Sequence, residues 1–228
     1  MNFDLSPLWI SCKTAVASTL ITFFLGIGTA WFMSRRKGGF KVFLDALFTL
    51  PMVLPPTVLG FFLLLIFGKN GPIGKVLFSI GIHLIFSWPA TVIAATVVSF
   101  PLMYKTTLGA FHQLDKNISN AARTLGISEG RIFWTIIVPL AWPGIAAGTV
   151  LSFARSLGEF GATLMMAGNI PGKTQTIPVA IFFSVEGGDM KTAMYWVLII
   201  FLLSLAVIFS TNYWSNHGTT HMNTGAKN

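Results

Sequence analysis

The sequence predicts an all-α membrane protein with five transmembrane helices, and two observations support this fold class. The chain has 228 residues, of which 54% are hydrophobic and only 10% are charged, whereas a soluble domain carries about 25% charged residues. It also contains five apolar runs that reach or approach the roughly 20 residues that a helix needs to cross a bilayer. We therefore expect one membrane domain that covers residues 1–228.

The apolar runs define the expected spans, which are residues 9–33, 42–67, 84–103, 132–154 and 192–210. The N-terminus lacks the basic region of a cleaved signal peptide and the first run is too long for one, so we expect the first run to be a retained span. Two shorter runs, 160–167 and 177–185, cannot span the bilayer alone. They predict a re-entrant segment before the last span, buried in protein.

The distribution of lysine and arginine predicts the orientation. With the N-terminus outside, the inner segments hold nine basic residues, namely Arg35, Arg36, Lys37, Lys41, Lys105, Lys116, Arg123, Arg131 and Lys227. The outer segments hold four, namely Lys69, Lys75, Lys173 and Lys191. Because cytoplasmic loops carry the basic excess, we expect the N-terminus outside and the C-terminus in the cytoplasm. If residues 160–185 formed a sixth span, the C-terminus would lie outside instead.

The second expected span contains three prolines within six residues, Pro51, Pro55 and Pro56. Each proline removes a backbone donor and clashes with the preceding turn, so the helix must kink or break there. Broken helices at membrane depth often line a transport path. A packing kink is the alternative, and the sequence leaves both open.

Arg155 and Glu159 lie at the end of the fourth expected span. A spacing of four residues places them on one helix face, where they can form an ion pair. Ionisable residues at membrane depth are costly and usually face a cavity or each other. The pair therefore predicts either a staple at the end of the span or, together with Ser156, the border of a translocation path or gate.

The segment 104–131 is polar and lies between two apolar runs. Asp115 can cap a short helix at its N-terminus, and Gly126 can end that helix. A second helical piece is expected from about Ser128. The pattern predicts a short helix-turn-helix on the cytoplasmic face; an amphipathic loop on the lipid surface is the alternative.

Signals for an enzyme or a cofactor site are weak. His83 and His112 have no cysteine or carboxylate near them at metal-ligand spacing. The chain lacks a Walker-type phosphate loop. His217 and His221 lie four apart in the polar tail 214–228, but Gly218 and the neighbouring threonines disfavour a helix there. We expect no metal or cofactor, no catalysis by this chain and, because the basic residues flank membrane spans, no nucleic-acid partner.

The polar loop resembles the "EAA" loop of the permease subunits of ABC-type importers. The resemblance lies in Asn120-Ala-Ala-Arg-Thr-Leu-Gly126, followed by Pro139. In that family the loop forms a coupling helix that docks in a cleft of a separate ATPase subunit. The resemblance therefore implies that the coupling residues are Asn120, Ala121, Ala122, Arg123, Leu125 and Gly126. Asn120 replaces a residue that is often Glu in the family.

The resemblance extends to the proline run 50–56, to residues 152–162 and to residues 169–172. These stretches are most similar to the permeases of molybdate ABC importers. The resemblance implies the type I importer permease fold with two copies of the chain around a pore in the inner membrane. It also implies one ATPase on each copy and a periplasmic binding protein that delivers the oxyanion. The candidates for the path or gate are Pro51, Pro55, Pro56, Arg155, Ser156 and Glu159.

Two alternatives remain at this point. Tungstate or sulfate importers share much of the stretch from Arg155 onward, although sulfate permeases are usually longer. A passive channel or a structural membrane protein would explain the spans and the prolines. It would give no reason for the Ala-Ala-Arg-Thr-Leu-Gly loop.

Overall fold

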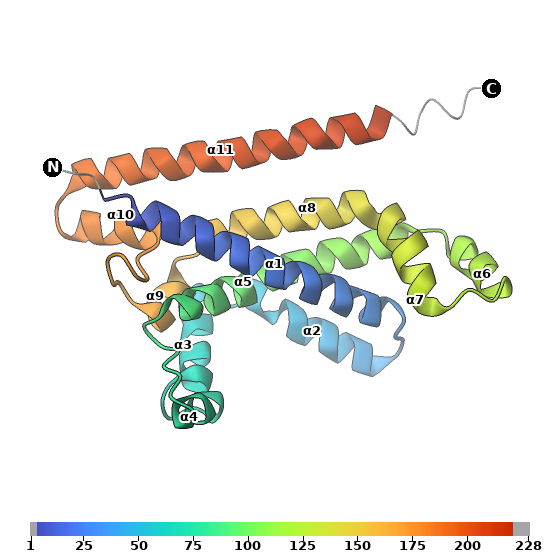
Figure 1. Cartoon of the computed structure of the whole chain (residues 1–228), viewed down its shortest axis with the longest axis horizontal. Helices are drawn as coiled ribbons and strands as arrows, with labels where there is room; N and C mark the ends of the chain where they lie inside the picture. The colour runs from blue at the N-terminus through green and yellow to red at the C-terminus, as the bar shows by residue number, and fades with distance from the viewer. Residues whose placement is uncertain (1–3, 221–228) are drawn as a thin grey trace.

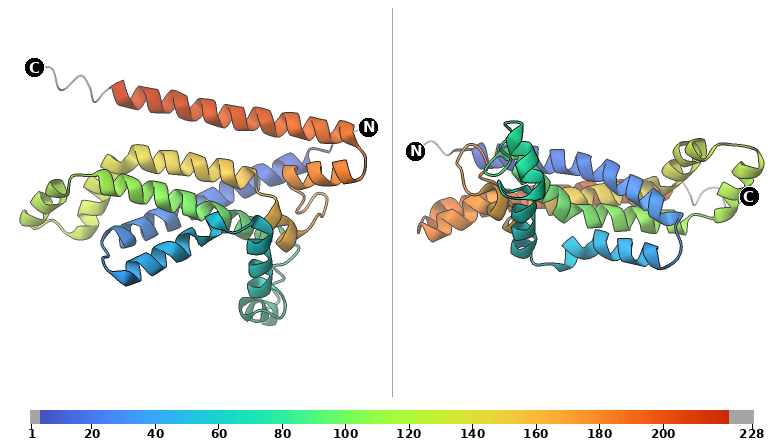
Figure 2. Two further views of the ribbon diagram at one scale, coloured as in Figure 1. Left: turned by 180° about the vertical axis from the view of Figure 1, so that it is seen from behind. Right: turned by 90° about the horizontal axis from the view of Figure 1, so that it is seen from below.

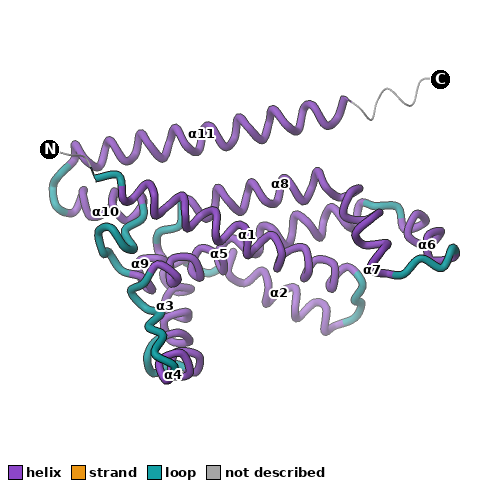
Figure 3. The backbone as a smooth tube through the Cα atoms, viewed as in Figure 1, coloured by secondary structure: helices purple, strands orange, loops and turns teal. Residues whose placement is uncertain are grey.

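The structure, a computed structural model, describes residues 4–220, and within this range every regular element is a helix (Figure 3). The long helices are α1 (Ser6–Ser34), α5 (Trp88–Gln113), α8 (Val138–Leu157) and α11 (Met190–Thr220). The shorter ones are α2 (Gly39–Val53), α3 (Pro56–Phe67), α4 (Pro72–Ser79), α6 (Lys116–Thr124), α7 (Glu129–Ile132), the π-helix η1 (Phe133–Ile137), α9 (Gly161–Ala167) and α10 (Ile177–Glu186). The all-α fold class is confirmed.

The long helices and α2 run along the long axis of the molecule (Figure 1). The start of α1 lies at one end with α9 and α10, whereas α6 and α7 lie at the opposite end, as does the far end of α11 (Figure 2). Four helical stretches are long and apolar enough to cross a membrane, namely Ser6–Ser34, Trp88–Gln113, Glu129–Leu157 and Met190–Phe209. The bent pair α2 and α3 supplies a fifth candidate.

The second span is broken at its prolines, as the sequence predicts. α2 ends at Val53, α3 begins at Pro56, and the two helices are bent by 115°. Leu54 adopts an extended conformation, with ψ 139°, which suits the residue before a proline. The break follows because neither Pro55 nor Pro56 can donate the backbone hydrogen bonds that would carry a helix through this point.

The core forms where α1, α5 and α8 pack together. Tyr104, Met33 and Ile145 are fully buried in it. Small residues bring the helices close: a Cβ on Gly144 of α8 would lie 2.5 Å from the Cβ of Ala110 on α5. Near the N-terminal end of α1, the Ser11 hydroxyl accepts a hydrogen bond from the backbone N–H of Ile177, the first residue of α10, at 2.7 Å.

The short helix α3 rests on α9 through a close backbone contact. A Cβ on Gly60 would lie 2.8 Å from the Cα of Ala162, and a backbone atom cannot move aside as a flexible side chain can. Gly60→Leu is therefore expected to lower stability by about 1–3 kcal/mol, the usual cost of overpacking. The thermal unfolding midpoint of the purified protein in detergent measures this. Gly28→Leu is the control, because nothing lies within 4 Å of a Cβ at Gly28; equal midpoints for the two variants would contradict the prediction.

Two expected boundaries differ from the structure. α5 continues to Gln113 rather than ending near residue 103, because Tyr104, Leu108 and Phe111 remain buried in the core. The connecting segment is therefore shorter than the expected loop 104–131. α11 continues through Thr220, so the first part of the expected polar tail 214–228 is helical; residues 221–228, including His221, lie outside the described residues.

Candidate functional site

The polar loop folds into the short helix α6, and a side chain fixes its start. Asp115 is the N-cap residue, and its Oδ1 accepts a hydrogen bond from the backbone N–H of Asn117 at 2.9 Å. An aspartate at this position satisfies one of the donors that the first turn leaves unpaired. The expected cap is confirmed.

Gly126 ends α6. Its φ of 74° lies in the left-handed region, which a residue with a Cβ adopts only at a cost. The Gly126 N–H donates to the Arg123 carbonyl at 3.0 Å and the Ile127 N–H donates to the Ala122 carbonyl at 3.2 Å. These two bonds form a Schellman motif. The next helix, α7, begins with Ser128 as its N-cap residue, so the predicted helix-turn-helix is confirmed.

Glu129 joins α6 to the C-terminal end of α1. Its Oε1 pairs with Arg123 Nε at 2.6 Å and its Oε2 pairs with Arg35 Nη2 at 2.7 Å. Arg123 also donates to Asn120 Oδ1 at 2.8 Å. The hydrogen bond that Arg123 donates to Glu129 raises the pKa of the Arg123 guanidinium. Ion pairs therefore hold the loop to the helix bundle, and Asn120 adds a hydrogen bond to this network by accepting from Arg123.

The two faces of α6 differ in burial. Ala122 is buried in the core cluster, where it anchors the helix. Leu125, at the C-cap, is 79% exposed, and Ile118 is also exposed. Of the residues expected to couple to an ATPase, Ala122 is thus turned inward, whereas Asn120, Ala121, Arg123, Leu125 and Gly126 lie on the accessible surface. An anchored helix with an exposed apolar end is suited to contact a partner.

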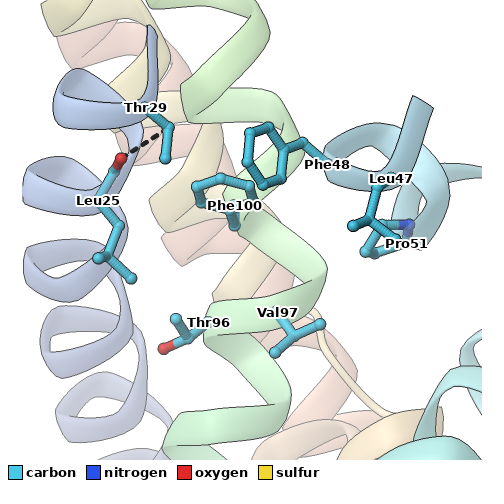
Figure 4. A pocket seen from close by; sticks show the side chains of 8 residues that line it. All are labelled: Leu25, Thr29, Leu47, Phe48, Pro51, Thr96, Val97 and Phe100. Atoms are coloured by element: carbon cyan, nitrogen blue, oxygen red, sulfur yellow. Dashed lines mark hydrogen bonds between the residues drawn. The ribbon is translucent and has the colours of Figure 1, made fainter. Parts of the chain in front are cut away.

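A cavity of about 300 Å³ lies between α1, α2 and α5 (Figure 4). Its lining is almost entirely apolar, and the residues are Leu25, Thr29, Leu47, Phe48, Pro51, Thr96, Val97 and Phe100. Pro51 is the one expected path residue in this lining. Pro55 and Pro56 lie beyond it, at the bend that leads into α3.

The expected ion pair between Arg155 and Glu159 is confirmed. Arg155 Nη1 lies 2.8 Å from Glu159 Oε2, and Glu159 Oε1 accepts a hydrogen bond from the backbone N–H of Ala162 in α9 at 2.8 Å. Glu159 is 2% exposed. Both of its carboxylate oxygens are engaged within the protein, so the pair braces the junction of α8 and α9. Ser156 is buried beside it, and none of the three lines the cavity of Figure 4.

A second polar cluster, which was not predicted from the sequence, joins α2 to α5. Asp45 Oδ1 accepts a hydrogen bond from the Tyr104 hydroxyl at 2.7 Å, and Asp45 Oδ2 pairs with Lys105 Nζ at 2.7 Å. The available signal was an aspartate inside an apolar run, since an ionisable residue at membrane depth is a functional candidate. No group of three histidine, cysteine or acidic residues in the described part of the chain could hold a metal ion.

Comparisons with known proteins identify the family. Residues 22–214 match the family described as binding-protein-dependent transport system inner membrane component. The chain is 43% identical over 211 residues to the molybdenum transport system permease protein ModB of Escherichia coli (strain K12), covering 90% of this chain and 92% of that protein. It is 40% identical over 210 residues to ModB of Haemophilus influenzae, covering 91% and 92%.

The fold also matches a solved structure. A bacterial ABC transporter involved in the import of the acidic polysaccharide alginate gives a TM-score of 0.78 at 14% identity, covering 95% of this chain and 80% of that one. At this identity the likeness concerns the fold, which is that of a type I ABC importer permease. Members of this family are non-catalytic membrane subunits, and ATP hydrolysis belongs to a separate ATPase. The chain therefore belongs to the binding-protein-dependent transport system inner membrane components, the multi-pass permease subunits of ABC importers.

Proposed function

We propose that this chain is the permease subunit of a molybdate importer. Two copies form the pore, each docks on one ATPase subunit, and a periplasmic binding protein delivers the anion to the outer mouth. The substrate assignment rests on the 40–43% identity, over about nine-tenths of both chains, to permeases named for molybdenum transport. A passive channel would leave α6 without a role.

In this proposal α6 is the coupling helix, and its contacting residues are Asn120, Ala121, Arg123, Leu125 and Gly126, with Ala122 as the anchor. The exposure of Leu125 and the attachment of Arg123 to Glu129 support this role, because Glu129 of α7 links α6 to Arg35 at the end of α1. The end that carries α6 then faces the cytoplasm. In this proposal the N-terminus is outside and the C-terminus is cytoplasmic; the far end of α11 lies at the same end of the molecule as α6, which supports the orientation (Figure 1).

Transport in this proposal follows alternating access. ATP binding closes the ATPase dimer, moves both coupling helices and opens the pore outward; hydrolysis resets it. The bundle must have two arrangements that events at α6 can bias. The residues proposed for the translocation path or gate lie at two separate places in the structure. Pro51 lies at the cavity and Pro55 and Pro56 at the bend, while Arg155, Ser156 and Glu159 form the brace at the start of α9.

Uptake by the reconstituted complex tests the proposal. Proteoliposomes with the permease, its ATPase and its binding protein are expected to accumulate molybdate only when both ATP and the binding protein are present. Competition with tungstate and sulfate then measures the preference. Uptake that sulfate blocks better than molybdate would assign the chain to a sulfate importer. Uptake without ATP would indicate a channel.

A further inference from the structure

The cluster of Asp45, Tyr104 and Lys105 is the main polar connection between α2 and the bundle. Tyr104 is fully buried, whereas the Asp45 and Lys105 side chains are 32% and 43% exposed. Thr49, one turn further along α2, bonds back to the carbonyls of Asp45 and Ala46 in its own helix. The Asp45 carboxylate therefore carries the polar part of the contact between α2 and α5.

The rest of α2 is held weakly. None of its residues is buried, and Leu44 and Phe48 are only partly buried where they pack on the core cluster. Both ends of α2 can pivot. Gly38, before its first residue, has a φ of 94° with no atom within 4 Å of a Cβ, and the break at Leu54 and Pro55 uncouples α2 from α3.

The polar cluster borders the cavity between α1, α2 and α5. The ring of Tyr104 lies 5.5 Å from that of Phe48 and 6.0 Å from that of Phe100, and both phenylalanines line the cavity. Leu47, Phe48 and Pro51 form the α2 wall of the cavity (Figure 4). A displacement of α2 that separates Asp45 from α5 would therefore move this whole wall away and widen the cavity.

The position of Asp45 on α2 makes its contacts with Tyr104 and Lys105 important for holding α2 in place. It lies about 9 Å along α2 from Gly39, at a rise of 1.5 Å per residue. Displacing α2 would break the ion pair with Lys105 and the hydrogen bond from Tyr104, and it would leave the buried Tyr104 hydroxyl without its partner. The arrangement with α2 packed on α5 and the arrangement with α2 displaced thus differ by the loss of these polar contacts of Asp45.

We propose that Asp45 is a latch: it holds α2 against α5 and keeps the cavity narrow, and α2 is the wall that moves when the cavity widens. Asp45 acts through the position of α2 and is therefore a positioning residue for transport. The proposal rests on the function proposed above, because it gives α2 a part in the transport cycle. The latch itself does not depend on which anion is carried.

Thiol labelling of the complete complex in proteoliposomes tests the latch. The background is Cys12→Ser, which removes the natural cysteine, with Thr96→Cys as the probe on the α5 side of the cavity. The Thr96 hydroxyl has no hydrogen-bond partner in the structure, so the probe removes no bond. A charged methanethiosulfonate reagent labels the probe, and mass spectrometry of the permease gives the rate without ATP.

Asp45→Asn and Lys105→Gln are each expected to raise the labelling rate by on the order of tenfold, as loss of one charge-assisted hydrogen bond implies. The double variant is expected to label no faster than the quicker single variant, because both changes release the same latch. Lys41→Gln is the matched control. It removes a positive charge one turn from Asp45, but its ammonium group is not in the ion pair, so the rate is expected to stay that of the parent.

Labelling of Asp45→Asn and Lys105→Gln at the parent rate would overturn the latch. A labelling rate in Lys41→Gln that rises as much as in these two variants would also overturn it. If either variant fails to assemble with the ATPase, Tyr104→Phe decides the question. It removes one hydroxyl and keeps the ring beside Phe48 and Phe100, so a smaller rise supports the latch and no rise overturns it. A parent complex that does not transport molybdate but shows the labelling pattern would refute the proposed function and leave the latch intact.

Discussion

Gly126→Val is expected to reduce ATP-driven uptake at least tenfold while the protein still inserts into the membrane. The φ of Gly126 is 74°, and the left-handed region costs a residue with a Cβ about 1–2 kcal/mol, with a branched side chain at the upper end. The strain would be relieved by breaking the two Schellman hydrogen bonds that end α6. α6 would then lose its fixed angle to α7, and, under the proposed function, force from the ATPase would not reach the bundle.

Two further variants make this prediction specific. Gly126→Asn is expected to keep most of the uptake, because asparagine enters the left-handed region more readily than other residues. Gly130→Ala, in α7, is expected to behave like the parent, since it needs no positive φ and meets no atom within 4 Å. Uptake and ATPase pull-down are measured together. If Gly126→Val retains the ATPase and transports at the parent rate, α6 is not the coupling helix.

The second large effect is expected from Arg155→Gln, which leaves the Glu159 carboxylate buried without a counter-charge. Removing one partner of a buried ion pair costs about 3–5 kcal/mol; the Arg155 side chain is 34% exposed, so we expect the lower part of that range. The thermal unfolding midpoint of the purified protein is expected to fall by several degrees. The double variant Arg155→Gln with Glu159→Gln is expected to be more stable than the single one, because no buried charge remains.

The double variant also separates the two interpretations of the pair. We expect it to fold and to transport at close to the parent rate, since both oxygens of Glu159 serve contacts within the protein. A double variant that is folded and bound to its ATPase but has lost uptake would place the pair in the translocation path. A double variant less stable than Arg155→Gln alone would contradict the electrostatic account.

The sequence predicted those features that depend on neighbours along the chain. The cap at Asp115, the end of α6 at Gly126 and the pairing of Arg155 with Glu159 all involve residues within a few positions of each other, where helix geometry decides the outcome. The break at Pro55 and Pro56 was predictable for the same reason, because proline acts on its own turn.

Features that depend on packing between distant segments were not predictable. Asp45 meets Tyr104 and Lys105 across about sixty positions, and their register depends on how α2 lies on α5. The bend of 115° is set by the contact of α3 with α9, which the prolines permit but do not specify. The extension of α5 to Gln113 was not predicted, because polar residues such as Lys105 favoured a loop after residue 103. One face of this stretch nevertheless remains apolar.

The attachments of α1 have a consequence for how the two ends of the molecule communicate. The helix is continuous over 29 residues, about 43 Å. It is fixed to the first residue of α10 through Ser11 at one end and to Glu129 through Arg35 at the other. A rigid helix attached at both ends passes a shift of one attachment to the other. A displacement at Ser11 or at Arg35 would therefore tilt α1 as a whole and couple the two ends of the molecule mechanically.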